Sequence, residues 1–344
     1  MNFFISAHPD RISEEDLFMT SDLPHISIII INWNGWKDTI ECLESLYQMS
    51  YPNFDIFLLD NNSSDNSINE IKSYCLGKLK IRSKYLKYNS NNKPINIFEY
   101  HYQNIEFHQN LNQITNSLKQ KSENKLHLII NEKNYMFVEG NNIGIRYAIK
   151  YINTDYILLL NNDTIVEKDL IEEIVKIIDN NKKIGIIGPR ICSYDNPNQN
   201  QWESLQNLNN YLYEIDFVSG AALLLRKELI QKIGFLDNRY IQYVEDKDYC
   251  YSARRAGYKV IYAQTKSKIL HKVSVSMKKI TGFQLYFKTR NTFLFKCKHS
   301  KKSQFLLFIF RFFLITFLME LKRYPDEKRH FLKGVKDGIL LILK

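Results

Sequence analysis

Four short apolar segments, each followed at once by polar residues, limit what this 344-residue chain can fold into. They span residues 26–31, 55–59, 126–130 and 156–160. Segments of this length with few polar positions are typical of strands that are buried on both faces. Helical spacing of apolar residues follows at 39–47, at 140–150 and at 168–179. The alternation predicts an α/β protein with a mostly parallel, Rossmann-like sheet flanked by helices.

Polar residues stand where these strands are expected to end. They are Asn32-Trp33-Asn34, residues 60–65, Gly140-Asn141-Asn142 and Asn161-Asn162-Asp163. In open α/β sheets, ligands bind outside the carboxyl ends of the strands. We therefore expect these clusters to meet at one edge of the sheet and to form one ligand site.

Asp163 is a candidate ligand for a hard cation such as Mg²⁺ or Mn²⁺, because such ions prefer oxygen donors and share substrate phosphates. An Asx turn, or an N-cap for the helix near residue 168, explains the same residue equally well. Asp60, followed by Ser63, is open to the same two interpretations. His271 ends a further expected strand and is either a metal ligand or a structural residue.

Three carboxylates within four residues open an expected helix that runs to Gly257: Glu245, Asp246 and Asp248. Like charges this close raise one another's pKa, which suits a general base. An ordinary acidic helix start is the alternative. A helix at 227–233 and a strand at 259–263 flank this helix in the sequence.

The chain divides into three regions. Residues 1–25 are expected to be an N-terminal extension, and they lack the basic segment and long apolar stretch of a signal peptide. Residues 26–275 carry the strand–helix rhythm, which residues 77–125 interrupt. We interpret this interruption as an inserted hairpin plus a helix. Residues 276–344 form a C-terminal helical region.

The C-terminal region contains an apolar helix at residues 305–319. At about 1.5 Å per residue it would measure roughly 22 Å, which is short of the ~30 Å hydrocarbon core of a membrane. Basic residues flank it on both sides, and this pattern suits the interface of an anionic membrane. A buried helix of a C-terminal bundle and a homodimer contact are the alternatives.

Charge and cysteine content narrow the class of protein. The chain has 47 Lys and Arg against 37 Asp and Glu, a net charge of +10. A basic surplus indicates an anionic partner such as nucleic acid, anionic lipid or a phosphorylated ligand. The five cysteines form no close pair and no metal-like spacing, which indicates reduced thiols in a cytosolic protein.

The order of the motifs resembles glycosyltransferase family 2, and more narrowly its rhamnosyltransferase-like branch. In chain order they are IIIINWN at 28–34, LLDNNSSD at 58–65, GNNIG at 140–144, LLLNND at 158–163, VSGA at 218–221, EDKDYCYSARRAGY at 245–258, and His271. The resemblance covers residues 26–275, with 77–125 as an insertion.

This resemblance implies a GT-A fold and inverting transfer of a sugar from a nucleotide-diphosphate donor to a hydroxyl group. It implies that Asp163 binds Mg²⁺ or Mn²⁺ with His271 as a further ligand. It also implies that Asp246, in the motif it forms with Glu245, is the catalytic base. A divalent cation would stabilise the charge that builds on the leaving diphosphate. The donor-binding residues would be Asn32, Trp33, Asn34, Asp60, Asn62, Asn141, Asn142, Asn162 and Arg290.

The chain departs from the family pattern at three places. Asn161 stands where the Asp-x-Asp motif has its first carboxylate, which leaves fewer anionic ligands for a metal. Met136 and Glu139 replace glycines, which would have allowed closer backbone approach. Arg290, in a Tyr-x-x-x-Arg-Asn element, either clamps the diphosphate or pairs with a surface acid.

Together these features predict a metal-dependent hexosyl- or rhamnosyltransferase that uses dTDP-rhamnose or a UDP-hexose. Its expected acceptor is a glycan, lipid-linked, in the assembly of surface polysaccharide or glycoprotein glycans. Its expected place is peripheral to the cytoplasmic face of the membrane. Two alternatives are open: an inactive relative that acts as a membrane-associated scaffold, and a nucleic-acid-binding protein, for which no motif is present.

Overall fold

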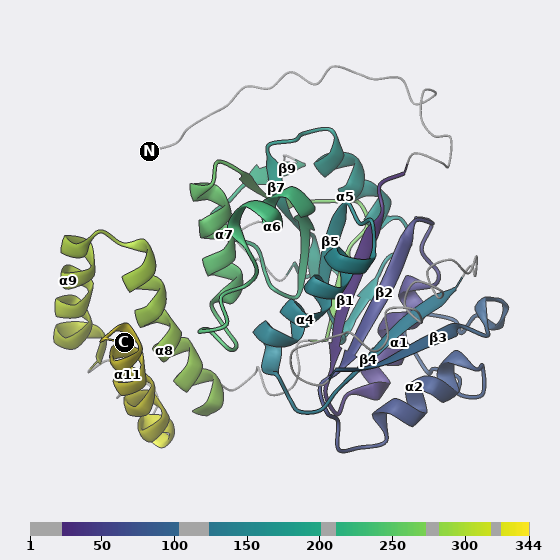
Figure 1. Ribbon diagram of the computed structural model, residues 1–344, viewed down its shortest axis with the longest axis horizontal. Coiled ribbons are helices and arrows are strands. Elements are labelled where there is room, and N and C mark those ends of the chain that lie inside the picture. The colour runs from purple at the N-terminus through teal and green to yellow at the C-terminus, as the bar shows by residue number, and fades with distance from the viewer. Residues whose placement is uncertain (1–22, 103–123, 201–210, 273–281, 318–324, 344) are drawn as a thin grey trace.

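The structure is a computed structural model that describes residues 23–102, 124–200, 211–272, 282–317 and 325–343. These residues form an α/β domain and a group of C-terminal helices beside it (Figure 1). The centre of the α/β domain is a nine-stranded sheet with a hydrophobic core on each face.

The strands lie in the order β3-β4-β2-β1-β5-β10-β7-β11-β9 across the sheet. Their bounds are Ile26–Asn32 for β1, Phe54–Asp60 for β2, Asn96–Tyr102 for β3, Lys125–Asn131 for β4, Tyr156–Asn161 for β5, Ile184–Pro189 for β7, Leu212–Glu214 for β9, Ala222–Arg226 for β10 and Lys259–Ala263 for β11. β10 is antiparallel to β5 and β7, and β9 is antiparallel to β11. The other pairs are parallel. The predicted mostly parallel sheet is confirmed.

The apolar strands are buried on both faces, as their composition predicts. Ile28 belongs to the core on one face and Ile29 to the core on the other, and neither is accessible to solvent. Leu158 and Leu159 of β5 are divided in the same way. Burying an aliphatic side chain of this size contributes about 1.5–3 kcal/mol. A polar residue on either face of these strands would therefore be costly.

Helices cover both faces of the sheet. The helices that contribute to one core are α1 (Trp36–Leu46), α2 (Ser67–Cys75) and α5 (Leu170–Asp179). Those on the other core are α4 (Met136–Tyr151), α6 (Lys227–Ile233) and α7 (Glu245–Arg255). The helix expected from residue 140 begins earlier, at Met136, so the GNNIG motif lies inside a helix and not in a loop.

A small second sheet extends the site edge of the domain. It contains β6 (Thr164–Val166), β8 (Ile191–Ser193) and β12 (Ile269–His271), in the order β6-β12-β8. β12 is antiparallel to β6, and His271 is opposite Thr164. This pairing brings two distant predicted site residues, Asp163 and His271, to the same place.

The expected hairpin in residues 77–125 is wrong. β3 pairs in parallel with β4, with Asn96 opposite Lys125, so it extends the main sheet at its edge. An alternating pattern reveals a half-buried strand but not its partner or its direction. Before it come a loop and a short 3₁₀ turn, η1 (Ser90–Asn92). The loop is anchored by the buried ion pair of Lys93 with Glu44, at 3.0 Å. Residues 103–123, where the helix was expected, lie outside the described residues.

The C-terminal helices pack into a unit of their own. They are α8 (Gly282–His299), α9 (Lys302–Arg311), a π-helical turn η4 (Phe312–Thr316), a 3₁₀ turn η5 (Pro325–Glu327) and α11 (Lys328–Leu343). Leu285, Phe293, Phe312 and Phe331 form its core. Within the described ranges, no helix is both long enough and apolar enough to span a bilayer.

Candidate active site

The ends of β5, β1 and β2 are joined by a chain of side-chain hydrogen bonds. Asn162 donates to the Thr39 hydroxyl at 2.9 Å, and that hydroxyl donates to Asn32 Oδ1 at 2.8 Å. Asn32 Nδ2 in turn donates to Asp60 Oδ1 at 2.7 Å. The register places Asn32 directly opposite Asp60. Three of the predicted site residues thus meet at one edge of the sheet.

Asp60 also shapes the loop that follows β2. It is fully buried, and its carboxylate accepts the Ser63 backbone N–H at 2.9 Å and the Ser63 hydroxyl at 2.7 Å. The turn interpretation left open by the sequence is therefore present in the structure. A contact of Asp60 with the base or ribose of a donor stays a prediction.

The loops after β1 and β2 are tied together and leave an aromatic ring exposed. Asn34 Oδ1 accepts the Ser64 backbone N–H at 2.8 Å, and the Asn34 backbone N–H donates to Ser63 Oγ at 2.9 Å. Trp33 lies on this rim with 57% of its surface accessible. An exposed indole beside polar side chains is suited to stack on a nucleobase.

The two predicted metal ligands contact each other. Asp163 Oδ1 and His271 Nε2 are 3.1 Å apart, and the Lys272 backbone N–H donates to the Asp163 carbonyl at 2.9 Å. Among the described residues, no group of three or more His, Cys, Asp and Glu side chains could hold a metal. The pair suits an ion such as Mn²⁺ only if water and donor phosphates complete its coordination. A carboxylate oxygen and an imidazole nitrogen are both ligands that such an ion accepts.

The acidic helix start lies beside this pair. Asp246 Oδ2 accepts the Gly220 backbone N–H at 3.0 Å, and Asp246 Oδ1 accepts the Lys247 backbone N–H at 2.7 Å. The carbonyl of Ala221, the residue after Gly220, accepts the Asn161 backbone N–H at 3.0 Å. The turn at 219–221 thereby joins the candidate base to the end of β5.

Burial makes both carboxyl groups of this motif more basic. It raises the pKa of Asp246, although the backbone N–H groups of Lys247 and Gly220 lower it. Burial, and then the neighbouring charge of Asp246, raise the pKa of Glu245 to about 8. Glu245 Oε2 is buried and has no hydrogen-bond partner within the described ranges. A carboxyl group with a raised pKa can accept a proton near neutral pH.

Backbone conformation also marks this edge. In the described part of the chain, the residues with positive φ other than glycine are Asn34, Asn62, Met136, Ile241, Tyr243 and Val244. Five of them lie in the loops that follow β1 and β2 or that precede α7, and Met136 is the first residue of α4. Such conformations are costly for most residue types and are concentrated at functional sites.

Two predicted donor-binding residues have structural partners. Asn141 donates to the Phe137 carbonyl at 2.9 Å within α4. Asn142 donates to the Leu236 carbonyl at 2.8 Å and to Asn238 Oδ1 at 2.6 Å, so it anchors the loop after α6. Both side chains are buried. Their contact with a donor stays a prediction.

Arg290, predicted either to clamp the diphosphate or to pair with a surface acid, has two hydrogen-bond partners in the structure. Its guanidinium donates to the Arg239 carbonyl at 2.8 Å and to Asn291 Oδ1 at 2.6 Å, and it is 8% exposed. Among the described residues, no acidic side chain forms an ion pair with it. A role as diphosphate clamp stays a prediction.

Several residues at this edge were missed by the sequence reasoning. Thr39 links two strand ends, and Asn131 donates to Asn61 Oδ1 at 2.8 Å at the end of β4. Lys272 pairs with Asp38, at 2.6 Å, and with Glu41. Although burial alone would lower it, these acids raise the pKa of Lys272. The usable signal was the repeated asparagine at strand ends.

The mostly parallel sheet, with polar side chains at its strand ends and a buried acidic motif at the start of α7, has the GT-A fold of glycosyltransferases. The chain belongs to glycosyltransferase family 2. A family model described as "Glycosyltransferase like family 2" matches residues 119–292, about half of the chain, and one described as "Glycosyl transferase family 2" matches residues 27–97. The predicted family and fold are confirmed, and the rhamnosyltransferase-like branch stays a prediction.

Known relatives are distant. The chain is 26% identical over 187 residues to the low-salt glycan biosynthesis hexosyltransferase Agl10 of Haloferax volcanii, which covers 50% of this chain and 61% of that relative. Among solved structures, residues 1–349 of S. aureus TarS in complex with UDP have a TM-score of 0.56 at 13% identity, covering 92% of this chain and 80% of that fragment. The mannosyltransferase PcManGT of Pyrobaculum calidifontis, in complex with GDP-Man and Mn²⁺, has a TM-score of 0.53 at 9% identity, covering 93% and 88%.

Proposed function

We propose that this protein transfers a sugar, with inversion, from a nucleotide-diphosphate donor to a hydroxyl group of a glycan acceptor. The observation that carries the proposal is the turn at 219–221. Its Gly220 backbone N–H holds the Asp246 carboxylate, and its Ala221 carbonyl holds the Asn161 backbone next to Asp163. The same short segment therefore holds the proposed proton acceptor, Asp246, and the end of β5 that carries the proposed metal ligand, Asp163.

Asp246 is the proposed base. Inversion requires the acceptor oxygen to attack the anomeric carbon from the face opposite the leaving diphosphate, and that oxygen must lose its proton as it attacks. Burial keeps the pKa of Asp246 above its ordinary value, which makes it a better proton acceptor. The Gly220 and Lys247 backbone N–H groups orient both of its oxygens.

Asp163 and His271 are the proposed protein ligands of a divalent cation. When bound, such an ion stabilises negative charge on the leaving diphosphate. Trp33, Asn34 and Asn62 on the exposed rim are proposed to contact the nucleotide. The donor is proposed to be dTDP-rhamnose or a UDP-hexose. The relatives support a nucleotide sugar in general, since TarS is described with UDP and PcManGT with GDP-Man and Mn²⁺.

A thermal-shift screen of nucleotide sugars, with Mn²⁺, Mg²⁺ or EDTA, tests donor and metal together. We expect one nucleotide class to raise the melting temperature, and more strongly with the metal. Asp163→Ala should lose the metal-dependent part of that rise, whereas Asp195→Asn, at an exposed position, should keep it. If no nucleotide sugar binds in a metal-dependent way, the scaffold alternative is favoured.

Transfer itself is tested with Asp246→Asn, which keeps the shape of the side chain and removes the base. We expect donor binding to persist and turnover to fall by roughly a hundredfold or more. Near-normal turnover would show that another group accepts the proton. A glycan acceptor that is lipid-linked, in the assembly of surface polysaccharide or glycoprotein glycans, is part of the proposal, and the name of Agl10 supports glycan biosynthesis.

We also propose that α9 contacts an anionic membrane surface, on its cytoplasmic face. One face of α9 and the following turn remains open, with its apolar side chains 43–64% exposed: Leu306, Leu307, Phe310, Phe313 and Leu314. These positions recur with helical spacing, whereas Phe308 and Phe312 turn inward to the bundle.

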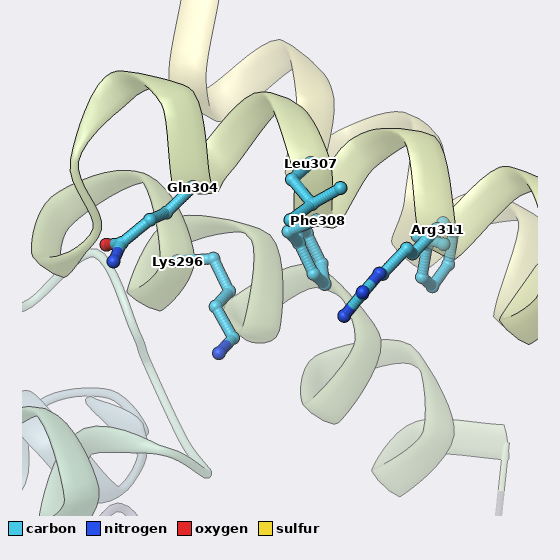
Figure 2. Close-up of a pocket in the computed structure, with 6 residues that line it drawn as sticks. Lys296, Gln304, Leu307, Phe308 and Arg311 are labelled. Atoms are coloured by element: carbon cyan, nitrogen blue, oxygen red, sulfur yellow. The ribbon is translucent and has the colours of Figure 1, made fainter.

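The charge around this face is complementary to anionic lipid. Residues 282–317 contain no Asp or Glu. Lys296 and Arg311 line a hollow with Phe308 between them, and Figure 2 shows both cationic side chains extending to the same side. Neither forms an ion pair with a described residue, and Lys296 Nζ lies 6.0 Å from the centre of the Phe308 ring. Such an arrangement suits lipid phosphates above an apolar floor.

Sedimentation with vesicles tests this contact. The protein should bind vesicles that contain phosphatidylglycerol more strongly than pure phosphatidylcholine, and Phe310→Ser with Leu314→Ser should weaken binding. Leu212→Ser, at an exposed apolar position on β9, is the matched control. If the double variant instead abolishes self-association in light scattering, α9 is a homodimer contact and the membrane proposal fails.

A further inference from the structure

The loop that leads into the acidic motif has an unusual backbone. Ile241, Tyr243 and Val244 all have positive φ, at 65°, 66° and 72°. β-branched and aromatic residues avoid this region because the side chain crowds the backbone. Val244 is the residue directly before Glu245 and Asp246, at the start of α7. The conformation of this loop therefore sets where the two carboxyl groups point.

A side chain from another part of the chain, Asn291, makes three hydrogen bonds to this loop. Asn291 of α8 is fully buried, and its Nδ2 donates to the carbonyls of Tyr240 at 2.8 Å, Gln242 at 2.7 Å and Tyr243 at 2.7 Å. An amide has two N–H groups, so the three carbonyls share them. The neighbouring Arg290 adds a fourth carbonyl, that of Arg239, and orients the Asn291 amide by donating to its oxygen.

These contacts suit the left-handed backbone. The carbonyls of Tyr240, Gln242 and Tyr243 come together at the Asn291 amide, where they would repel one another without a donor among them. An asparagine amide supplies two donors in one plane and adds no charge to be buried. Leucine or alanine at position 291 would leave three carbonyls, one buried and two part-buried, without this donor.

We propose that Asn291 is a positioning residue for the reaction, and that it keeps Asp246 aligned by locking the loop at 240–244, in which Ile241, Tyr243 and Val244 are left-handed. The proposal rests on the proposed function of Asp246 as the base. Asn291 touches neither donor nor acceptor in this role. It acts through the loop, and through the start of α7 that the loop sets.

The position of α8 is itself held against α7. The Asp248 carboxylate receives Lys298 at 2.8 Å and His299 at 2.7 Å from the end of α8. The two helices therefore remain in register when a single side chain is changed. A substitution at Asn291 should accordingly disturb the loop locally and leave the rest of the interface in place.

The test compares Asn291→Ser with the wild-type protein in steady-state kinetics. Serine is small enough to fit and keeps one hydroxyl, which satisfies one carbonyl at most. We expect kcat to fall by roughly tenfold to a hundredfold, as expected for a displaced reacting group, with the donor KM changed by less than about twofold. Asn291→Gln, which keeps the amide but shifts it by one methylene, should give the same division between kcat and KM.

Thr292→Ala is the matched control. Its hydroxyl donates to the Lys288 carbonyl at 2.7 Å within α8 and does not reach the loop. It should leave kcat unchanged. The proposal is overturned if folded Asn291→Ser and Asn291→Gln retain kcat within about twofold of the wild type, or if their losses lie entirely in donor KM.

Hydrogen exchange separates this proposal from the proposed function. In the Asn291→Gln variant, backbone amides of residues 243–248 should exchange faster than in the wild type, while those of β1 and β5 should not. This readout needs no substrate. Faster exchange without any sugar transfer by the wild-type protein would contradict the proposed function and not the loop contact. Unchanged exchange would overturn the positioning role.

Discussion

Asp248 is the most informative position for the stability of this protein, because it joins the acidic helix to the C-terminal unit. The side chain is 2% exposed. Its carboxylate accepts the Tyr240 hydroxyl at 2.8 Å, Lys298 at 2.8 Å and His299 at 2.7 Å. The sequence grouped Asp248 with Glu245 and Asp246 as one acidic motif. The structure separates them, since Asp248 turns away from the site.

The expected cost of Asp248→Ala follows from these partners. Removing one member of a buried charged pair destabilises by about 3–5 kcal/mol, because the remaining charge is left uncompensated. The Tyr240 hydroxyl, which is also buried, loses its acceptor and adds about 1–3 kcal/mol. Part of this loss in stability is offset, because the Lys298 side chain is 29% exposed to solvent and still pairs with Asp237 at 2.9 Å. We therefore expect a net loss of about 3–5 kcal/mol in the free energy of unfolding.

Urea denaturation measures this loss, with the midpoint compared at an unchanged slope. Asp216→Ala is the control, because Asp216, which lies between β9 and β10, pairs with Arg254 of α7 but is 80% exposed. An exposed pair contributes about 0–1 kcal/mol, so this control should change little. If Asp248→Ala costs no more than Asp216→Ala, the buried network contributes nothing measurable and the reasoning from burial is refuted.

Two further predictions concern pH and packing. In the folded state the pKa of Glu245 is raised from 4.5 to about 8. Between these two pH values, Glu245 therefore keeps a proton in the folded protein that it has released in the unfolded chain. The free energy of unfolding should therefore decrease as pH rises from about 4.5 to about 8. Urea titrations at several pH values measure this pH dependence, and Glu245→Gln should reduce it. An unchanged pH dependence in this variant would show that other groups cause it. A Cβ atom at Gly334 would lie 2.7 Å from the Tyr286 carbonyl oxygen, so Gly334→Val should separate α11 from α8 and cost about 1–3 kcal/mol, measured as a lower melting temperature. Lys336→Val, at an exposed position on the same helix, should not have this effect.

Local patterns in the sequence were sufficient for the central strands. The predicted bounds of the strands at 26–31, 55–59, 126–130 and 156–160 differ by at most one residue at each end from β1, β2, β4 and β5. A strand buried on both faces is apolar at nearly every position, so it is visible in the sequence without knowledge of its neighbours. The clusters after these strands were equally visible, since parallel strands end at one edge.

Contacts between residues that are distant in the chain could not be predicted from local patterns. The direction of β3 depends on β4, which lies beyond residues 103–123, and an alternating pattern carries no information on that pairing. The family resemblance predicted Asn141 and Asn142 as donor-binding residues, but it did not show their partners within the protein. The loop that Asn142 anchors, at 236–238, becomes its neighbour only in the folded chain.

The sequence by itself therefore determined the α/β class, the family and the edge of the sheet where the site lies. The tertiary structure decided how each polar residue is used. It brings His271 to Asp163 through the pairing of β12 with β6, and it directs Asp246 to Gly220 while Asp248 faces α8. It also divides the apolar helix near residue 310 into a packed face and an open one. Periodicity reports whether a residue is apolar or polar at its own position, whereas a hydrogen bond or a buried face depends on which distant segment arrives beside it.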